Sequence, residues 1–217
     1  MTTRQGFHLS LETLRKAVLE MGRITQNALR QSVDSLLLMD SNVANQIVAG
    51  DQKINQLQFS IEEECVLLLA RQQPVARDLR RIMAALHISI DLERIADMAV
   101  DIAKTTLRIS HDVPDVFRQD MVSMFTTVDT MITVALDAYG LESTEKAETL
   151  AERDDRMDHS YKITLEHLAT LDSSSDPERL YSYAILARCM ERIGDHVTNI
   201  GESVIYIQTG NRAELNA

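Results

Sequence analysis

The sequence predicts an all-helical protein built from two copies of a three-helix unit. Long segments carry apolar residues at helical spacing, turn residues are scarce, and the second half of the chain repeats the first. Only 7 Gly and 3 Pro occur in 217 residues, so turns are few and the elements between them are long. No segment alternates apolar and polar residues as a half-buried strand would.

Three long helices are predicted in the first half. The first runs from about Leu9 to Met39, where apolar residues recur at helical spacing. The second runs from about Ser41 to Arg71, with Ser41 as its candidate cap. The third begins at Pro74, a residue suited to the first turn of a helix, and runs to about Ile109. The stretch "SHDVPD" then interrupts the helical pattern.

Three further helices are predicted in the second half. The fourth runs from about Pro114 to Tyr139 and the fifth from about Thr144 to Leu171. The stretch "DSSSDPE" is the clearest loop in the chain. Asp176 and Pro177 then cap the sixth helix, which ends at Gly210.

An internal repeat relates the two halves. At an offset of 103 positions many residues fall on similar ones, and Pro74 falls on Pro177. Beyond the prolines the offset becomes 98, so five residues are missing early in the last helix. There "ERIADMAVDIAK", from Glu93, matches "ERIGDHVTNIGE", from Glu191. Two prolines and a shared phrase in register indicate two copies of one unit.

Net charge and hydropathy argue against several classes of function. The net charge is −11, which argues against nucleic-acid binding because such proteins need a basic surface. No stretch reaches the roughly 18 apolar residues of a membrane span. The start of the chain lacks the apolar run of a signal peptide. We therefore expect a cytoplasmic protein.

The repeated phrase places carboxylates one helical turn apart. An α-helix advances about 100° per residue, so Glu93, Asp97 and Asp101 lie within about 80° of one another. Apolar residues form a stripe on nearly the opposite face, so the acids are expected to face water or a partner. The second copy repeats the row with Glu191, Asp195, Asn199 and Glu202.

Two interpretations of these rows are open. A solvated helix face is one, although like charges four residues apart destabilise a helix by roughly 0.2–0.5 kcal/mol per pair. The other is metal binding, since neighbouring carboxylates can reach one cation with oxygen ligands at about 2.0–2.6 Å. Oxygen-only ligands favour Mg, Ca, Mn or Fe. The recurrence of the row in both copies favours the metal hypothesis.

No enzyme is predicted. The chain has no phosphate-cradling glycine loop, no GxSxG and no HExxH. Hydrolytic chemistry also needs a pocket and a positioned water, which an exposed row of carboxylates does not supply.

A charged cluster follows Pro74 in "QQPVARDLRRI". Arg77, Arg80 and Arg81 surround Asp78 there. Local ion pairs at a helix start are one interpretation, each contributing little to stability. A docking patch for a partner is the other. The second half has no counterpart, because its residues are missing at this point.

These motifs resemble the PhoU family of phosphate-uptake regulators over nearly the whole chain. The resemblance rests on the doubled ERI[AG]Dxxx[DN]I, on "RQQPVARDLR", on "EMG" near the start and on "IYIQTG" near the end. It implies two tandem three-helix bundles related by pseudo-twofold symmetry, which we place at residues 1–112 and 113–217.

The resemblance also implies a function. Such a protein is a metal-carrying cytoplasmic adaptor, often a homodimer, that links the ATPase subunit of a phosphate ABC transporter to a sensor histidine kinase. It damps the phosphate-starvation response when phosphate is plentiful and reaches the membrane only through these partners.

A direct metal- or phosphate-handling protein is the alternative, either an iron store or a metal-dependent phosphatase. A helical scaffold with merely solvated acids is the third hypothesis.

Carried over residue by residue, the resemblance assigns two sets of side chains. Candidates for partner contact are Arg77, Asp78 and Arg80. The chain departs from the family pattern at Lys104, which stands where an acid is expected and puts full occupancy of the first site in doubt. The metals implied are Fe, Zn, Mn, Mg or Ni, and the implied ligands are Glu93, Asp97, Asp101, Glu191, Asp195, Asn199 and Glu202.

Overall fold

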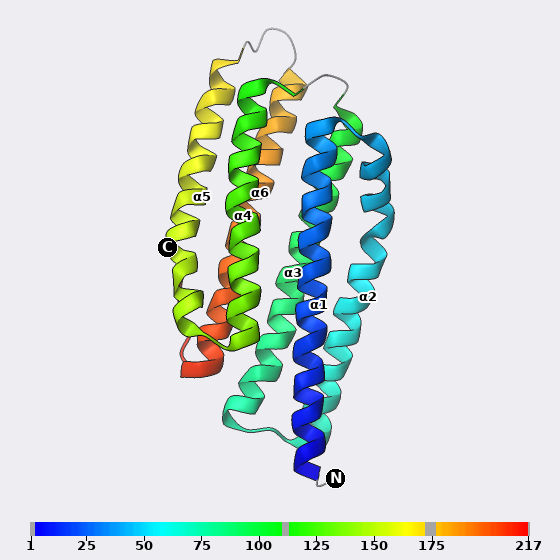
Figure 1. Cartoon of the computed structure of the whole chain (residues 1–217), viewed down its shortest axis with the longest axis vertical. Helices are drawn as coiled ribbons and strands as arrows, with labels where there is room; N and C mark the ends of the chain where they lie inside the picture. The colour runs from blue at the N-terminus through cyan, green and yellow to red at the C-terminus, as the bar shows by residue number, and fades with distance from the viewer. Residues whose placement is uncertain (1–2, 110–112, 172–176, 217) are drawn as a thin grey trace.

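The computed structural model describes residues 3–109, 113–171 and 177–216. These residues form six helices and no strand, arranged as two three-helix bundles side by side (Figure 1). The predicted all-α fold of two tandem bundles is thereby confirmed. In chain order the helices are α1 Thr3–Leu38, α2 Ser41–Gln72, α3 Ala76–Arg108, α4 Asp115–Leu141, α5 Thr144–Thr170 and α6 Pro177–Thr209.

Polar caps decide where two of the helices begin. Asp40, and not the predicted Ser41, caps α2, because its carboxylate accepts hydrogen bonds from two backbone N–H groups of the first turn. Ser143 caps α5 by accepting from the backbone N–H three residues on, at 3.3 Å. Gly210 follows α6 with a φ of +75°, a conformation that glycine adopts without a Cβ clash.

The start of α3 differs from the prediction by two residues. A residue before proline is held away from the right-handed helical region, and Gln73 takes left-handed angles of φ 44° and ψ 54°. Val75 is extended, at φ −127° and ψ 160°. Pro74 therefore belongs to the connection, and α3 begins at Ala76. The predicted cap Asp176 lies outside the described residues.

One hydrophobic core runs through both halves. Within each half every helix contacts the other two, and in the described residues the halves meet through α3 against α6 and α1 against α4. The predicted boundary at residues 112 and 113 adjoins the segment 110–112, which is not described, so the division into 1–112 and 113–217 stays a prediction. The predicted apolar stripes are all 0% exposed: Ile88, Leu92, Ile95, Ala99, Ile102, Leu186, Met190, Ile193, Val197, Ile200 and Val204.

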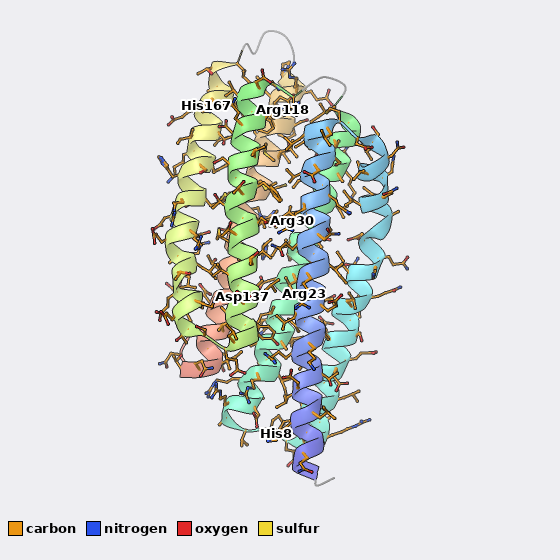
Figure 2. The ribbon with its side chains drawn as sticks, in the orientation of Figure 1. His8, Arg23, Arg30, Arg118, Asp137 and His167 are labelled. Atoms are coloured by element: carbon orange, nitrogen blue, oxygen red, sulfur yellow. The ribbon has the colours of Figure 1, made fainter. Side chains whose placement is uncertain are left out.

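Polar bonds line the seam between α1 and α4. Arg30 donates two hydrogen bonds to the carboxylate of Asp129, at 2.7 and 2.8 Å. Gln26 donates to the same carboxylate at 3.0 Å. Arg118 of α4 donates to the backbone carbonyl of Leu37. Figure 2 shows Arg30 and Arg118 between the two helices, so polar bonds join the bundles along the upper part of this seam in that view.

The apolar character of α4 follows from its packing. The expectation that no stretch is long and apolar enough for a membrane span is wrong for α4, which among the described helices meets this criterion by length and composition alone. Its buried side chains, Phe117, Met121 and Met124 among them, lie in the core. The helix contacts α1, α5 and α6, which accounts for its apolar face.

We expect Gly22→Val to destabilise the protein, because a Cβ at Gly22 overlaps the side chain of Leu136 across the α1–α4 seam. Overpacking of this kind costs roughly 1–3 kcal/mol. Gly50 of α2 is the matched control, since a Cβ there meets nothing within 4 Å, and Gly50→Val should change the free energy of unfolding by about 0.5 kcal/mol or less. Urea unfolding measures both. Equal effects would contradict the close approach.

Candidate metal centres

The first acidic row lies where α3 borders α2. The side chain of Glu93 is only 18% exposed. Burial, and next the charge of Asp97, raise the pKa of Glu93 above its usual range. Asp51 and Glu62 of α2 add to that increase, while Arg94 opposes it. The row therefore faces carboxylates from a second helix.

The α2 side of this seam carries two residues that the sequence analysis did not single out as ligands. Asp51 and Asn55 stand one turn apart, and the Nδ2 of Asn55 donates to the Oδ2 of Asp51 at 3.1 Å. The Oδ1 atoms of both residues are buried without a hydrogen-bond partner. A buried polar atom left unpaired costs about 1–3 kcal/mol. A ligand that binds these two oxygens would remove that cost.

The far end of the first row opens to solvent. The side chains of Asp97 and Asp101 are 41% and 60% exposed. Arg94 donates to Asp97 at 3.1 Å, and the ammonium of Lys104 lies 3.7 Å from a carboxylate oxygen of Asp101. Basic side chains thus partly neutralise the exposed end. Arg94 also reaches the less exposed end, where its Nε lies 3.4 Å from a carboxylate oxygen of Glu93.

The second row is more deeply buried than the first. Glu191 is 9% exposed and Asp154, on the facing helix α5, is 4% exposed. The expectation that these acids face water or a partner is wrong for Glu191, because α5 of the same bundle covers that side of α6. One oxygen of Glu191 accepts from Arg188. The other, Oε2, and the Oδ1 of Asp154 are buried without a partner.

A glycine makes room for the Asp154 carboxylate. Gly194 lies in α6 between Glu191 and Asp195. A Cβ added to Gly194 would stand 3.0 Å from the Oδ1 of Asp154, closer than side chains normally approach. The carboxylate of α5 therefore rests directly on the backbone of α6, among the acids that the sequence analysis identified.

Electrostatics at the second row reflect the crowding of like charges. Burial, then the charges of Asp195, Asp158 and Glu191, raise the pKa of Asp154 to about 7. Burial and Asp195 likewise raise the pKa of Glu191. Several carboxylates thus share a region of low solvation, an arrangement that a bound cation would stabilise.

The remaining predicted ligands of the second half have hydrogen-bond partners outside the row. Asp195 accepts a hydrogen bond from the carboxamide of Asn216 at 2.7 Å. Asn199 donates to Asp91 of α3 at 3.2 Å. Glu202 accepts a backbone N–H from the segment after α6, at 2.9 Å. Of the four predicted ligands in this half, Glu191 and Asp195 are the two whose charges act on Asp154, and the ligand roles of all four residues stay predictions.

The chemistry of both seams fits a hard cation. In the described part of the chain, no three His, Cys, Asp or Glu side chains already stand as a group that could hold a metal ion, so the acids must turn to enclose one. Their donor atoms are all oxygens, which suit Mg, Mn, Ca and Fe. Buried oxygens without partners occur in both seams, at Asp51, Asn55, Asp154 and Glu191.

The predicted partner patch lies at the junction of the two halves. Arg77 donates to Glu142 at 2.6 Å, and Arg81 donates to both oxygens of Glu142 at 2.7 and 3.1 Å. Asp78 accepts from Arg81 at 3.0 Å. Arg80 donates to a backbone carbonyl near the end of α6, also at 3.0 Å. These residues join the start of α3 to the second bundle, and a cavity of about 360 Å³ opens beside them.

Glu142 holds this junction from an unfavourable backbone conformation. It follows α4 with left-handed angles of φ 49° and ψ 44°, which residues other than glycine seldom adopt. Burial by itself would raise the pKa of Glu142, but the hydrogen bonds from Arg81 and Arg77 outweigh it and keep that pKa below its usual range. Gln208 of α6 donates to the same carboxylate at 3.1 Å.

Comparison with known proteins gives concordant results. A family model described as "PhoU domain" matches residues 18–106 and 121–204. The "Phosphate-specific transport system accessory protein PhoU homolog" of Clostridium acetobutylicum is 36% identical over 217 residues, covering 99% of each chain. The homolog of Pseudomonas aeruginosa is 35% identical, covering 95% of this chain and 86% of the relative.

Solved structures share the fold. The crystal structure of PhoU from Pseudomonas aeruginosa matches with a TM-score of 0.89 at 35% identity, covering 94% of this chain and all of that one. The phosphate transport system regulatory protein PhoU from Streptococcus pneumoniae matches with a TM-score of 0.89 at 27% identity. It covers 96% of this chain and 99% of that one.

We expect Asp154→Asn to stabilise the metal-free protein at neutral pH. The pKa of Asp154 is about 7 in the folded protein, against an ordinary value of 3.8. Between these values the folded state binds more protons than the unfolded state, so this carboxyl makes the free energy of unfolding fall as pH rises through that window. At pH 7.5 the variant should be more stable by roughly 1–3 kcal/mol, and at pH 4 nearly equal.

Urea unfolding in EDTA at the two pH values measures this difference. Asp137→Asn is the matched control, because the side chain of Asp137 is 60% exposed on α4. The same pH dependence in Asp154→Asn and the unaltered protein would contradict the crowding of charge at Asp154.

Proposed function

This chain belongs to the PhoU family, and we propose that it is an accessory protein that regulates phosphate transport and carries metal ions in that role. In this proposal it links the ATPase subunit of a phosphate ABC transporter to a sensor histidine kinase and represses the starvation response when phosphate is plentiful. It acts in the cytoplasm as a homodimer, catalyses no reaction, and reaches the membrane only through its partners. The names of its relatives support the accessory role.

The metal part of the proposal rests on two buried carboxylate oxygens. The Oδ1 of Asp154 and the Oε2 of Glu191 have no hydrogen-bond donor. A buried oxygen without a donor costs about 1–3 kcal/mol, and more when it is charged. A cation between α5 and α6 supplies the missing charge, which is why we favour a metal site over a solvated acidic face.

Each proposed site draws ligands from two helices. The first lies between α2 and α3 and the second between α5 and α6, so a bound ion bridges neighbouring helices in each half. Fe, Mn, Mg, Zn and Ni are the candidate ions. Asp101, Asn199 and Glu202 lie at the outer ends of the rows. The inner ligands that we propose are Asp51, Asn55, Glu93 and Asp97 for the first site, and Asp154, Asp158, Glu191 and Asp195 for the second.

The partner patch is proposed at the junction of the bundles. The side chain of Arg77 is 48% exposed, so a partner can reach it although it is paired with Glu142. Asp78 and Arg80 lie in the same turn of α3. A transporter or kinase bound there would contact the residues that join the two halves. Its affinity would then depend on how the two halves are arranged.

Metal retention tests the proposed sites. We expect protein purified without a chelating tag to retain metal, and Asp154→Asn combined with Glu191→Gln to lose the ion of the second half. Asp137→Asn, an exposed acid given the same change, should retain it. Elemental analysis after desalting measures the content. If the unaltered protein holds no metal and Mn²⁺ does not raise its thermal stability, the metal proposal fails.

Gene deletion tests the regulatory role. Deletion should give constitutive alkaline phosphatase activity in phosphate-rich medium, and complementation should restore repression. Arg77→Ala with Arg80→Ala should complement poorly if the patch contacts a partner, whereas Arg23→Ala, a 69% exposed side chain of α1, should complement fully. Repression that survives deletion argues against the regulator. Turnover of simple phosphate esters by metal-loaded protein would favour the phosphatase alternative instead.

A further inference from the structure

A short segment after α6 turns back along the second bundle. Gly210 makes the turn with its φ of +75°, and residues 211–216, the strap, follow without helix or strand structure. Ala213 and Leu215 pack against the core. The side chain of Leu215 approaches within 3.0 Å of the place where a Cβ on Gly201 would stand. The mark C lies beside α5 in Figure 1, in accord with this return path.

Two hydrogen bonds join the strap to the second acidic row. The backbone N–H of Leu215 donates to the Oε1 of Glu202 at 2.9 Å. The Nδ2 of Asn216 donates to the Oδ1 of Asp195 at 2.7 Å. Glu202 therefore anchors the strap, and the carboxamide of Asn216 stands at the carboxylate in the middle of the row.

A carboxamide beside a row of carboxylates can either donate a hydrogen bond to a carboxylate or offer its oxygen to a bound cation. It carries N–H donors on one side and an acceptor oxygen on the other. Toward a bare carboxylate it turns its N–H groups, as Asn216 does here. A half-turn about the terminal torsion, which is broad for asparagine, presents the oxygen at the same place. Side-chain amide oxygens are ordinary ligands of hard cations.

We propose that the strap is a third wall of the second metal site and that Asn216 supplies it with an oxygen ligand beside Asp195. The inference rests on the proposed function, because it requires a cation at this row. A separate feature indicates a ligand there: Asp154 is 4% exposed and its unpartnered Oδ1 lies against Gly194 of α6.

The first half cannot anchor a strap in the same way. At the offset of 98, Lys104 holds the position that corresponds to Glu202, and its ammonium lies 3.7 Å from Asp101. An ammonium cannot accept a backbone N–H, and its charge opposes a cation nearby. With Asn216 the second site has one more ligand than the first, and a carboxylate stands where the first half has Lys104. It should therefore bind a given cation more tightly than the first.

Titration with Mn²⁺ tests the role of Asn216. The full chain carries Glu93→Gln and Asp97→Asn, which remove the first site, and binding is followed by calorimetry and by loss of the free Mn²⁺ signal in EPR. Asn216→Ala should raise the Kd of the second site about tenfold, and Asn216→Asp should lower it. Asn211→Ala changes another amide of the strap, one that bonds Thr209 through its backbone, and should leave the Kd unchanged.

The failures of this inference and of the proposed metal function can be told apart. An unchanged or lower Kd in Asn216→Ala, with normal binding by the parent, overturns the role of Asn216 and leaves the metal site standing. Absence of Mn²⁺ binding by the parent at the second row overturns the metal site and this inference together. Because Asn216 is exposed, the substitution should not disturb folding, and urea unfolding of each variant verifies this.

Discussion

Burial of the aliphatic stripes on α3 and α6 sets the rotation of both helices, and the positions of all the acidic side chains depend on that rotation. The stripe residues, such as Leu92 and Ile193, are completely buried. Each such side chain contributes about 1.5–3 kcal/mol when removed from water, whereas each pair of like charges on the helix costs only about 0.2–0.5 kcal/mol. The core therefore determines the orientation, and the acids come to lie along the seams with α2 and α5.

Equivalent rows in the two halves have unequal surroundings. At the offset of 98, Gly194 of the second half corresponds to Ala96 of the first. The second row therefore has no side chain at this position, and the Asp154 carboxylate rests there on the backbone. In the first row the methyl group of Ala96 occupies the equivalent position. Lys104 of the first half likewise corresponds to Glu202 of the second, and the two side chains carry opposite charges. The apolar stripes are thus alike in the two halves, whereas the second acidic seam is buried and the first is more open.

The junction of the bundles lies on the same helix as the first acidic row. Arg77 and Arg81, in the first turns of α3, bind Glu142, and Glu93 follows three to four turns further along. One continuous helix, α3, therefore carries both the junction and the first acidic row. The five residues missing from the start of the last helix leave the second half without an equal cluster, so this connection is one-sided.

Much of the fold could be predicted because its signals are local. Helical periodicity, the scarcity of Gly and Pro, and the repeat sufficed for six helices in two units, and the predicted stripes are the buried ones. The errors are also local in origin. Asp40, which directly precedes the predicted cap Ser41, is the residue that caps α2. Proline suits the first turn of a helix, which predicted Pro74 inside α3. Proline also restricts the backbone of the residue before it, and α2 ends ahead of Gln73.

The candidate site was only half predictable, for a physical reason. Spacing along one helix shows which face its own acids share, so Glu93, Asp97, Glu191 and Asp195 could be identified. It does not show which residues of another helix meet that face, so it did not identify Asp51 or Asp154 as candidate ligands. By itself the sequence determined the helices, the repeat and the acidic rows, since these follow from periodicity within a segment. Only the tertiary structure decided which carboxylates are buried, what faces them and where residues 211–216 lie, because these depend on contacts between segments far apart in the chain.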